Sequence, residues 1–250
     1  MYQPEIGRFF TQDRFSEKYY DLTPYQYGAN NPIKYIDING DSLGLNEIDP
    51  GAIDQFKGIV QSGSGGYWLA NVDPQSGLVT LEENQYIEGS MTEDQAKFVG
   101  QLSNVINGPG LATINVANNS EQVVIGDIVN RTMDVGDMAK LGTDGKVTAQ
   151  KTLIHEVVEN YAVQGPNPVN VVTAHMRAGN AENRIGGAIL SPLGRTITQS
   201  VSNPNVSTLQ VPVLGPAQQA GTVRIHLYKN NVMGVMGNSM KPIFSPIIRR

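Results

Sequence analysis

The sequence predicts an α+β fold in which helices are mixed with antiparallel strands. Two segments, near 96–106 and 154–161, repeat apolar residues with the period of an amphipathic helix. Several shorter segments instead alternate apolar and polar residues, as half-buried strands do. The chain of 250 residues contains 27 glycines and 14 prolines, which indicates many turns between these elements. This length is enough to bury the core of one large domain or two small ones.

The expected helices are recognised by their periodicity and by the residues that begin and end them. They are a short helix after Asp49-Pro50 that ends at 62–66, one from Ser90 to 106, one at about 147–164 and one at about 169–185. Ser90 and Glu93 form a capping box, in which each side chain satisfies the other residue's free backbone amide. Glycine and proline at 108–110 and at 165–168 end the helices that precede them.

The expected strands are short and are joined by turns rich in Asn, Asp, Gly and Ser. They lie at 67–72, 77–81, 111–116, 122–125, 206–213, 222–228 and 232–236. Asn118-Asn119-Ser120 is expected to join 111–116 and 122–125 into a hairpin, and Lys229-Asn230-Asn231 to join the last two strands. The segment 133–146 is expected to be a loop. The part of the chain after residue 190 is therefore predicted to be rich in β-structure.

The composition limits the chemistry that is available. The chain has no cysteine, which excludes disulfides and thiolate metal sites, so a zinc ion would have to use His, Asp, Glu or water. No segment approaches the roughly 18 apolar residues of a membrane span. The N-terminus lacks the basic and apolar pattern of a signal peptide, so any export is expected to use another bacterial system.

Charge is unevenly distributed along the chain. Residues 44–138 contain 3 basic and 13 acidic residues, whereas residues 139–250 contain 11 basic and 4 acidic residues. One interpretation of this asymmetry is scattered charge that only keeps the protein in solution. A sharper alternative is that the C-terminal half binds an anion, either nucleic acid or an acidic partner protein.

The first 42 residues differ from the rest, since they hold six of the ten tyrosines. Their motifs are Gly7-Arg8-Phe9, Asp13, Tyr25-Gln26-Tyr27, Asn31-Pro32 and Asp37. In type and spacing these motifs resemble the C-terminal end of a bacterial RHS repeat-associated core. The resemblance divides the chain into an RHS remnant at 1–42, a linker with a short helix at 43–66, and a toxin domain at 67–250.

The RHS resemblance also implies how the toxin domain is released and delivered. In that family two aspartates cut the chain just after the second one, and here they correspond to Asp13 and Asp37. Each is usually followed by proline, but Arg14 and Ile38 follow them in this sequence. The resemblance further implies an enclosing RHS shell, a bacterial secretion apparatus that delivers the toxin into a target cell, and a cognate immunity protein.

The segment 152–183 carries the residues most suited to catalysis. His155 and Glu159 are four residues apart on a predicted helix and therefore share a face, with Glu156 about 100° around it. After the Gly-Pro turn, His175 and Glu182 share a face of the next helix, which can fold back onto the first. His155, Glu159, His175 and Glu182 could then bind a metal ion, with Glu156 as a general base.

This pattern resembles the zincin-like metallopeptidase toxins, although Glu159 stands where their H-E-x-x-H motif has a second histidine. The resemblance implies a pair of zincin-like helices, a zinc ion and a protein substrate in the target cell. Three alternatives stay open. The residues could be ordinary polar groups beside a core, the basic C-terminal half could belong to a nuclease that uses His226, or the toxin could be a non-enzymatic binding effector.

Overall fold

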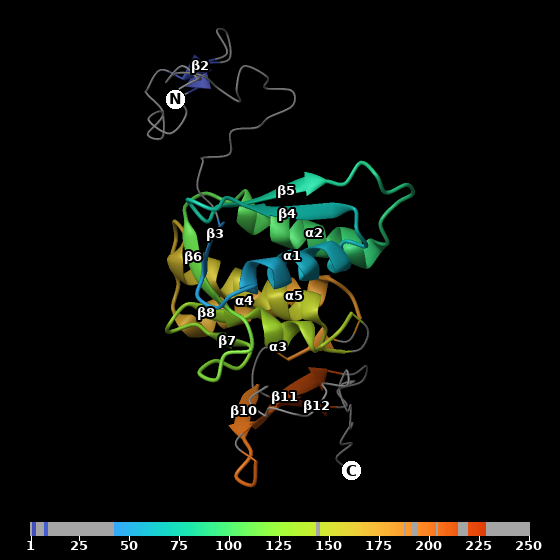
Figure 1. The fold of residues 1–250 in the computed structure, drawn as a ribbon, viewed down its shortest axis with the longest axis vertical. Helices are drawn as coiled ribbons and strands as arrows, with labels where there is room; N and C mark the ends of the chain where they lie inside the picture. Colours follow the sequence, from blue (N-terminus) through green and yellow to red (C-terminus); the bar gives the residue numbers. More distant parts are fainter. Residues whose placement is uncertain are drawn as a thin grey trace.

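The computed structural model describes residues 2–3, 8–9, 43–143, 146–187, 189–191, 195–203, 205–214 and 220–228. It confirms the predicted α+β class (Figure 1). In the first 42 residues the described part is a short hairpin of β1 (Tyr2–Gln3) and β2 (Arg8–Phe9). Asp13 and Asp37 lie outside the described residues, as does the expected strand at 232–236.

A four-stranded mixed sheet organises the body of the molecule. Its strands, in spatial order, are β3 (Leu43–Glu47), β6 (Ala112–Ala117), β8 (Thr132–Asp134) and β7 (Gly126–Asp127). The first three are parallel, and β7 runs antiparallel to β8 at the edge. The parallel strands contribute fully buried side chains such as Leu43, Ile114 and Met133, as expected for strands covered on both faces.

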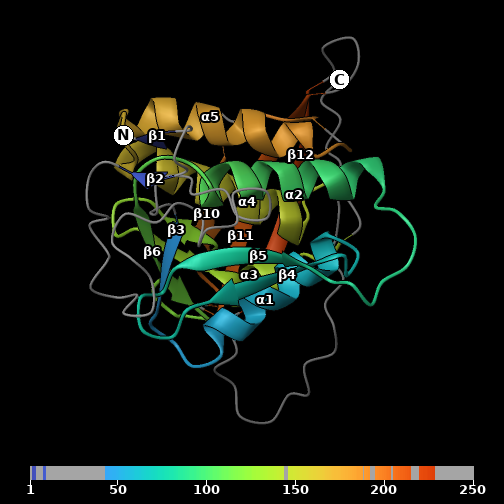
Figure 2. The ribbon, with the colours of Figure 1, turned by 90° about the horizontal axis from the view of Figure 1, so that it is seen from above.

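Five helices pack around one another beside this sheet. They are α1 (Ala52–Gly63), α2 (Glu93–Ile106), α3 (Val135–Ala139), α4 (Ala149–Gln164) and α5 (Val171–Arg184). The central one is α4, which contacts the other four helices and β6, and Figure 2 shows it between α5 and α1. Twelve of its 16 residues are buried, including several polar ones, so α4 has no broad solvated face that would account for its charged side chains.

Two antiparallel units complete the described part. A hairpin of β4 (Trp68–Val72) and β5 (Val79–Glu83) covers α1 and α2. The C-terminal sheet consists of β9 (Ile189–Leu190), β10 (Thr196–Gln199), β11 (Val206–Leu214) and β12 (Ala220–Tyr228), with β11 at its centre. The predicted β-rich C-terminal part is therefore present. No helix in the described ranges is long and apolar enough to cross a membrane.

Several sequence predictions of local structure were wrong. The segments 111–116 and 122–125 do not form a hairpin, because β6 lies between parallel β3 and β8 and the antiparallel partner of β8 begins only at Gly126. The expected loop at 133–146 contains the end of β8 and then α3, whose N-cap Asp134 accepts a hydrogen bond from the amide of Asp137. Thr92 and Gln95, not Ser90 and Glu93, form the capping box of α2.

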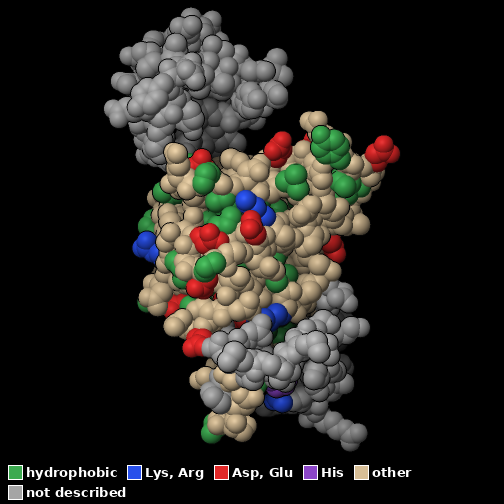
Figure 3. Space-filling model, viewed as in Figure 1, with side chains coloured by type: hydrophobic (Ala, Val, Ile, Leu, Met, Phe, Trp, Pro, Cys, Tyr) green, Lys and Arg blue, Asp and Glu red, His purple; other side chains and the backbone are tan. Residues whose placement is uncertain are grey.

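The segment 43–66, which was expected to be a linker with a short helix, forms β3 and α1. Both elements belong to the main core, to which Leu43, Phe56 and Val60 contribute fully buried side chains. The segment is thus part of the folded domain. On the face drawn in Figure 3, acidic side chains are scattered over the described surface and form no single patch.

Candidate metal centre

The buried helix α4 supplies the first two candidate ligands. Its N-cap is Thr148, whose hydroxyl accepts a hydrogen bond from the amide of Lys151. His155 and Glu159 follow one turn apart on the same face, as predicted, and only 2% and 5% of their surfaces are exposed. Burial lowers the pKa of His155, against the opposing effect of nearby carboxylates, so its imidazole is neutral at pH 7.

The next helix, α5, folds back along α4 and supplies the third candidate ligand, His175. The turn after α4 is closed by a hydrogen bond from the amide of Val169 to the carbonyl of Ala162, and Asn170 caps the start of α5. Ala174, Ala178 and Ala181 are buried on α5, and their small side chains let the helices approach closely. His175 consequently faces α4, while 28% of its side chain is exposed.

The three side chains converge on one point. His155 Nε2 lies 3.1 Å from His175 Nδ1, and His175 Nδ1 lies 2.7 Å from Glu159 Oε1. The imidazole rings meet edge to face, with centroids 4.6 Å apart. One ligand atom from each residue lies within 4.8 Å of the other two, so the cluster could hold a metal ion. Donor atoms around a tetrahedral ion are about 3.3 Å apart, so binding would require only small shifts.

Glu182 was predicted as a fourth ligand, but it lies on the other side of His155. Its Oε2 is 3.3 Å from His155 Nδ1, and the Arg195 guanidinium pairs with its Oε1. Glu182 is 1% exposed, and Oε2 has no hydrogen-bond partner within the described part of the chain. If His155 Nε2 binds a metal, the ring proton must be on Nδ1, where it would point at this oxygen. The orphaned oxygen therefore fits a metal on the Nε2 side.

Two cations surround Glu182. Arg195 Nη1 lies 3.3 Å from His155 Nδ1, and the Arg195 side chain is 16% exposed. A guanidinium can only donate, so this contact would open when the ring proton is on Nδ1. Lys151, one turn before His155, is almost fully buried and donates to the carbonyl of Gly186 at 2.9 Å. Burial lowers the pKa of Lys151, and the charge of Glu182 opposes that shift. Arg195 and Lys151 thus place positive charge on the same side of His155 as Glu182.

The Glu156 side chain faces the edge strand β7. Its carboxyl group contacts Gly126, and the residue is 8% exposed. Burial, and secondarily the negative charge of Glu159, raises the pKa of Glu156 to about 8. A carboxyl group whose pKa lies near neutrality can exchange protons with a substrate or with water at physiological pH.

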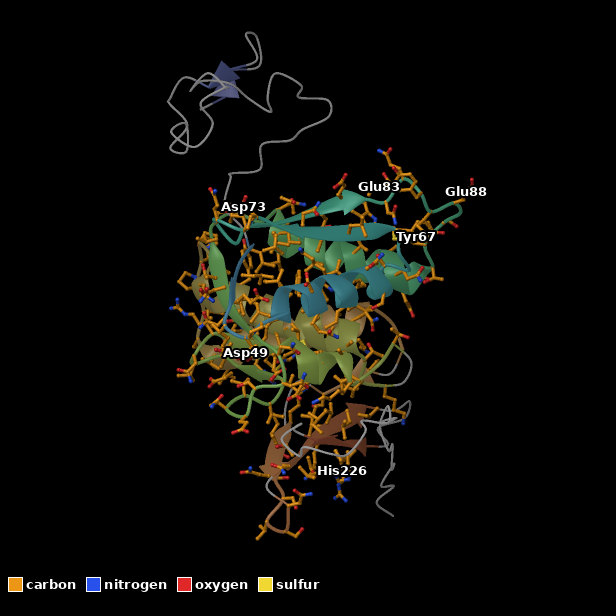
Figure 4. The ribbon with its side chains drawn as sticks, viewed as in Figure 1. Asp49, Tyr67, Asp73, Glu83, Glu88 and His226 are labelled. Atoms are coloured by element: carbon orange, nitrogen blue, oxygen red, sulfur yellow. The ribbon has the colours of Figure 1, made fainter. Side chains whose placement is uncertain are left out.

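Sequence reasoning missed Arg195 and Gly126. Neither belongs to a periodic pattern, and Arg195 is 40 residues from His155 in the chain. His226, the remaining histidine, is exposed on β12 and pairs with Thr208 Oγ1 at 3.0 Å (Figure 4). Within the described residues it belongs to no cluster that could hold a metal.

The fold and the cluster define an α+β protein that contains a buried His–Glu–His group able to hold a metal ion. Buried Glu156 follows His155 directly in the chain, and the Arg195–Glu182 ion pair lies on the Nδ1 side of His155. No protein-family model, curated protein or solved structure matches this chain.

Proposed function

We propose that this chain is a zinc-dependent hydrolase of peptide bonds and that it acts as the toxin domain of an RHS-type protein. The observation that carries the enzymatic part is the convergence of His155, Glu159 and His175 in a mostly buried cluster. Two imidazoles and one carboxylate are a ligand set that catalytic zinc uses, and three protein ligands leave a position open. When bound, zinc would polarise a carbonyl group and lower the pKa of water.

The other residues have separate roles in this proposal. With a metal at Nε2, the proton of His155 would lie on Nδ1, and Glu182 Oε2, 3.3 Å away, would accept it and keep Nε2 turned toward the metal. Arg195 holds Glu182 in place and offsets its charge. Glu156, which has a pKa of about 8 in the metal-free protein, would ionise beside a divalent cation. It would then take a proton from the attacking water and return it to the leaving amine.

The edge strand supports a peptide as the substrate. Among the described residues, β7 pairs with β8 alone, so an extended chain could pair with its outer edge through backbone groups other than the Gly126 amide, which donates to Val124. Gly126 on this strand contacts Glu156, which places the edge beside the proposed base. An extended peptide paired with β7 would therefore run past the site of the reaction.

The biological setting rests on the resemblance of residues 1–42 to an RHS core. In this setting a shell and secretion apparatus deliver the domain into a target cell, and a cognate immunity protein blocks it in the producing cell. The basic residues of the C-terminal half would then be available to bind these partner proteins. Exposed His226 has no carboxylate partner in the described part, which makes a nuclease centre there the weaker candidate.

Glu156→Gln tests this function, with Glu83→Gln on exposed β5 as the matched control. Elemental analysis of the purified protein should find one zinc per chain in all three proteins. Cleavage of an unfolded protein substrate should fall by about 10²–10⁴-fold in Glu156→Gln, because the general base is lost, and stay unchanged in Glu83→Gln.

Toxicity on expression in bacteria should follow the same order. The proposal fails if the wild-type protein binds no stoichiometric metal, or if toxicity persists in Glu156→Gln. Degradation of plasmid DNA or RNA without proteolysis would replace the peptidase with a nuclease.

A further inference from the structure

Gly126 occupies the point at which the edge strand meets Glu156. A methyl group built on Gly126 would overlap the carboxyl group of Glu156. The carboxyl group therefore fills the space that a side chain at position 126 would take.

The backbone conformation of Gly126 does not itself require glycine. Gly126 does not have a positive φ, so an alanine could adopt its backbone angles. Its neighbour Ile125 does have a positive φ of 66° although it is not a glycine. What excludes a side chain at Gly126 is thus space rather than conformation.

The strand cannot easily move away to make room. The amide of Gly126 donates to the carbonyl of Val124 at 2.8 Å, and the amide of Asp134 donates to the carbonyl of Ile125 at 2.7 Å. Ile125 is itself buried in the core. On the other side, Asp127 accepts hydrogen bonds from the amides of Val129 and Asn130 and fixes the following turn. A side chain at 126 would therefore displace Glu156.

We propose that Gly126 is a positioning residue, whose missing side chain creates the cradle that holds the Glu156 carboxyl group against β7, one residue along α4 from the candidate ligand His155. Its catalytic meaning rests on the proposed hydrolase function. The cradle itself does not, since the overlap involves two residues of the metal-free protein. Two experiments separate these parts.

The first experiment is a cycle of thermal melts in the presence of a chelator. Gly126→Ala should lower Tm by roughly 5 °C in the wild-type background, as overpacking does. The same loss should appear with Glu156→Gln, which keeps the size of the side chain. It should largely disappear with Glu156→Ala, which empties the cradle. Equal losses in all three backgrounds would overturn the proposal.

The second experiment measures turnover of an unfolded protein substrate. Gly126→Ala should retain bound zinc and a similar KM, while kcat falls by about 100-fold because the base is displaced. Gly100→Ala is the control, since a methyl group there meets nothing within 4 Å. Unchanged kcat in Gly126→Ala would overturn the positioning role. If the wild-type protein has no hydrolase activity, the proposed function fails, and the melts alone decide whether the cradle exists.

Discussion

The two sides of the His155 ring have opposite surroundings. At Nε2 the ring meets His175 and Glu159, and the 28% exposure of the His175 side chain connects this side to solvent. At Nδ1 it meets Glu182, which is 1% exposed, and the guanidinium of Arg195. One imidazole therefore separates an accessible side, where a ligand could enter, from a closed side that can only support the ring.

Charge differs across the ring in the same sense. At Nδ1 the carboxylate of Glu182 is offset by its pairing with Arg195. At Nε2 the carboxylate of Glu159 contacts His175, and burial keeps His155 uncharged. Among the described residues no Lys or Arg forms an ion pair with Glu159, so a cation is attracted to the accessible side rather than to the closed side.

The largest expected effect comes from breaking the accessible side. Glu159→Gln keeps the size of the side chain but removes its charge, and His175→Ala removes a ligand nitrogen. Each should weaken zinc binding by on the order of 10²–10³-fold, since several ligands share the binding free energy. Competition with a chromophoric chelator measures this affinity. Binding that is unchanged in both variants would show that the cluster is not a metal site.

Substitutions on the closed side should weaken zinc binding less. Glu182→Gln and Arg195→Gln should each weaken zinc binding by about 10–100-fold, because they act through the orientation of His155. If Glu182 were itself a ligand, its substitution would cost as much as that of Glu159. The ratio of the two losses therefore distinguishes a ligand from a supporting residue. Arg177→Gln, on the exposed part of α5, is the control for a lost positive charge.

The sequence predicted one side of this ring better than the other. Helical spacing predicts that His155 and Glu159 share a face, and the Gly-Pro turn predicts that α5 returns along α4. In such an antiparallel pair, His175 and Glu182 lie about 10 Å apart along α5. His155 therefore lies between them, with one at each ring nitrogen. Spacing alone places residues on a face and does not say which nitrogen they meet, so Glu182 was expected among the ligands.

Long-range pairings were beyond the local pattern. The alternation in 111–116 predicts a strand, but the parallel partners of β6 are β3 and β8, which come from distant segments. The cradle at Gly126 depends on this arrangement, because β7 reaches Glu156 only as the edge of that sheet. The position of Arg195 likewise depends on how the segment after α5 is held. There the amide side chain of Asn183 forms hydrogen bonds with the backbone of Leu190.

The smallest expected effect concerns Glu156 in the metal-free protein. Its pKa is about 8 when folded, above its ordinary value of 4.5. Between these values the unfolded chain has lost the proton that the folded protein retains, so stability falls as pH rises. The slope is about 1.4 kcal/mol per pH unit and ends above about pH 8. His155 opposes this decline near pH 6.5, where its imidazole is about half protonated in the unfolded chain and less so in the folded protein, and its contribution becomes small toward pH 8.

Urea unfolding in the presence of a chelator, at several pH values from 6.5 to 8, measures this slope. Glu156→Gln should remove the decline because it cannot ionise, and it should be more stable than the wild-type protein at pH 8. With zinc bound, the wild-type decline should also disappear, since a cation on the accessible side of His155 stabilises the ionised carboxylate. A slope that is the same in both proteins would mean that Glu156 is not held in a desolvated place beside the cluster.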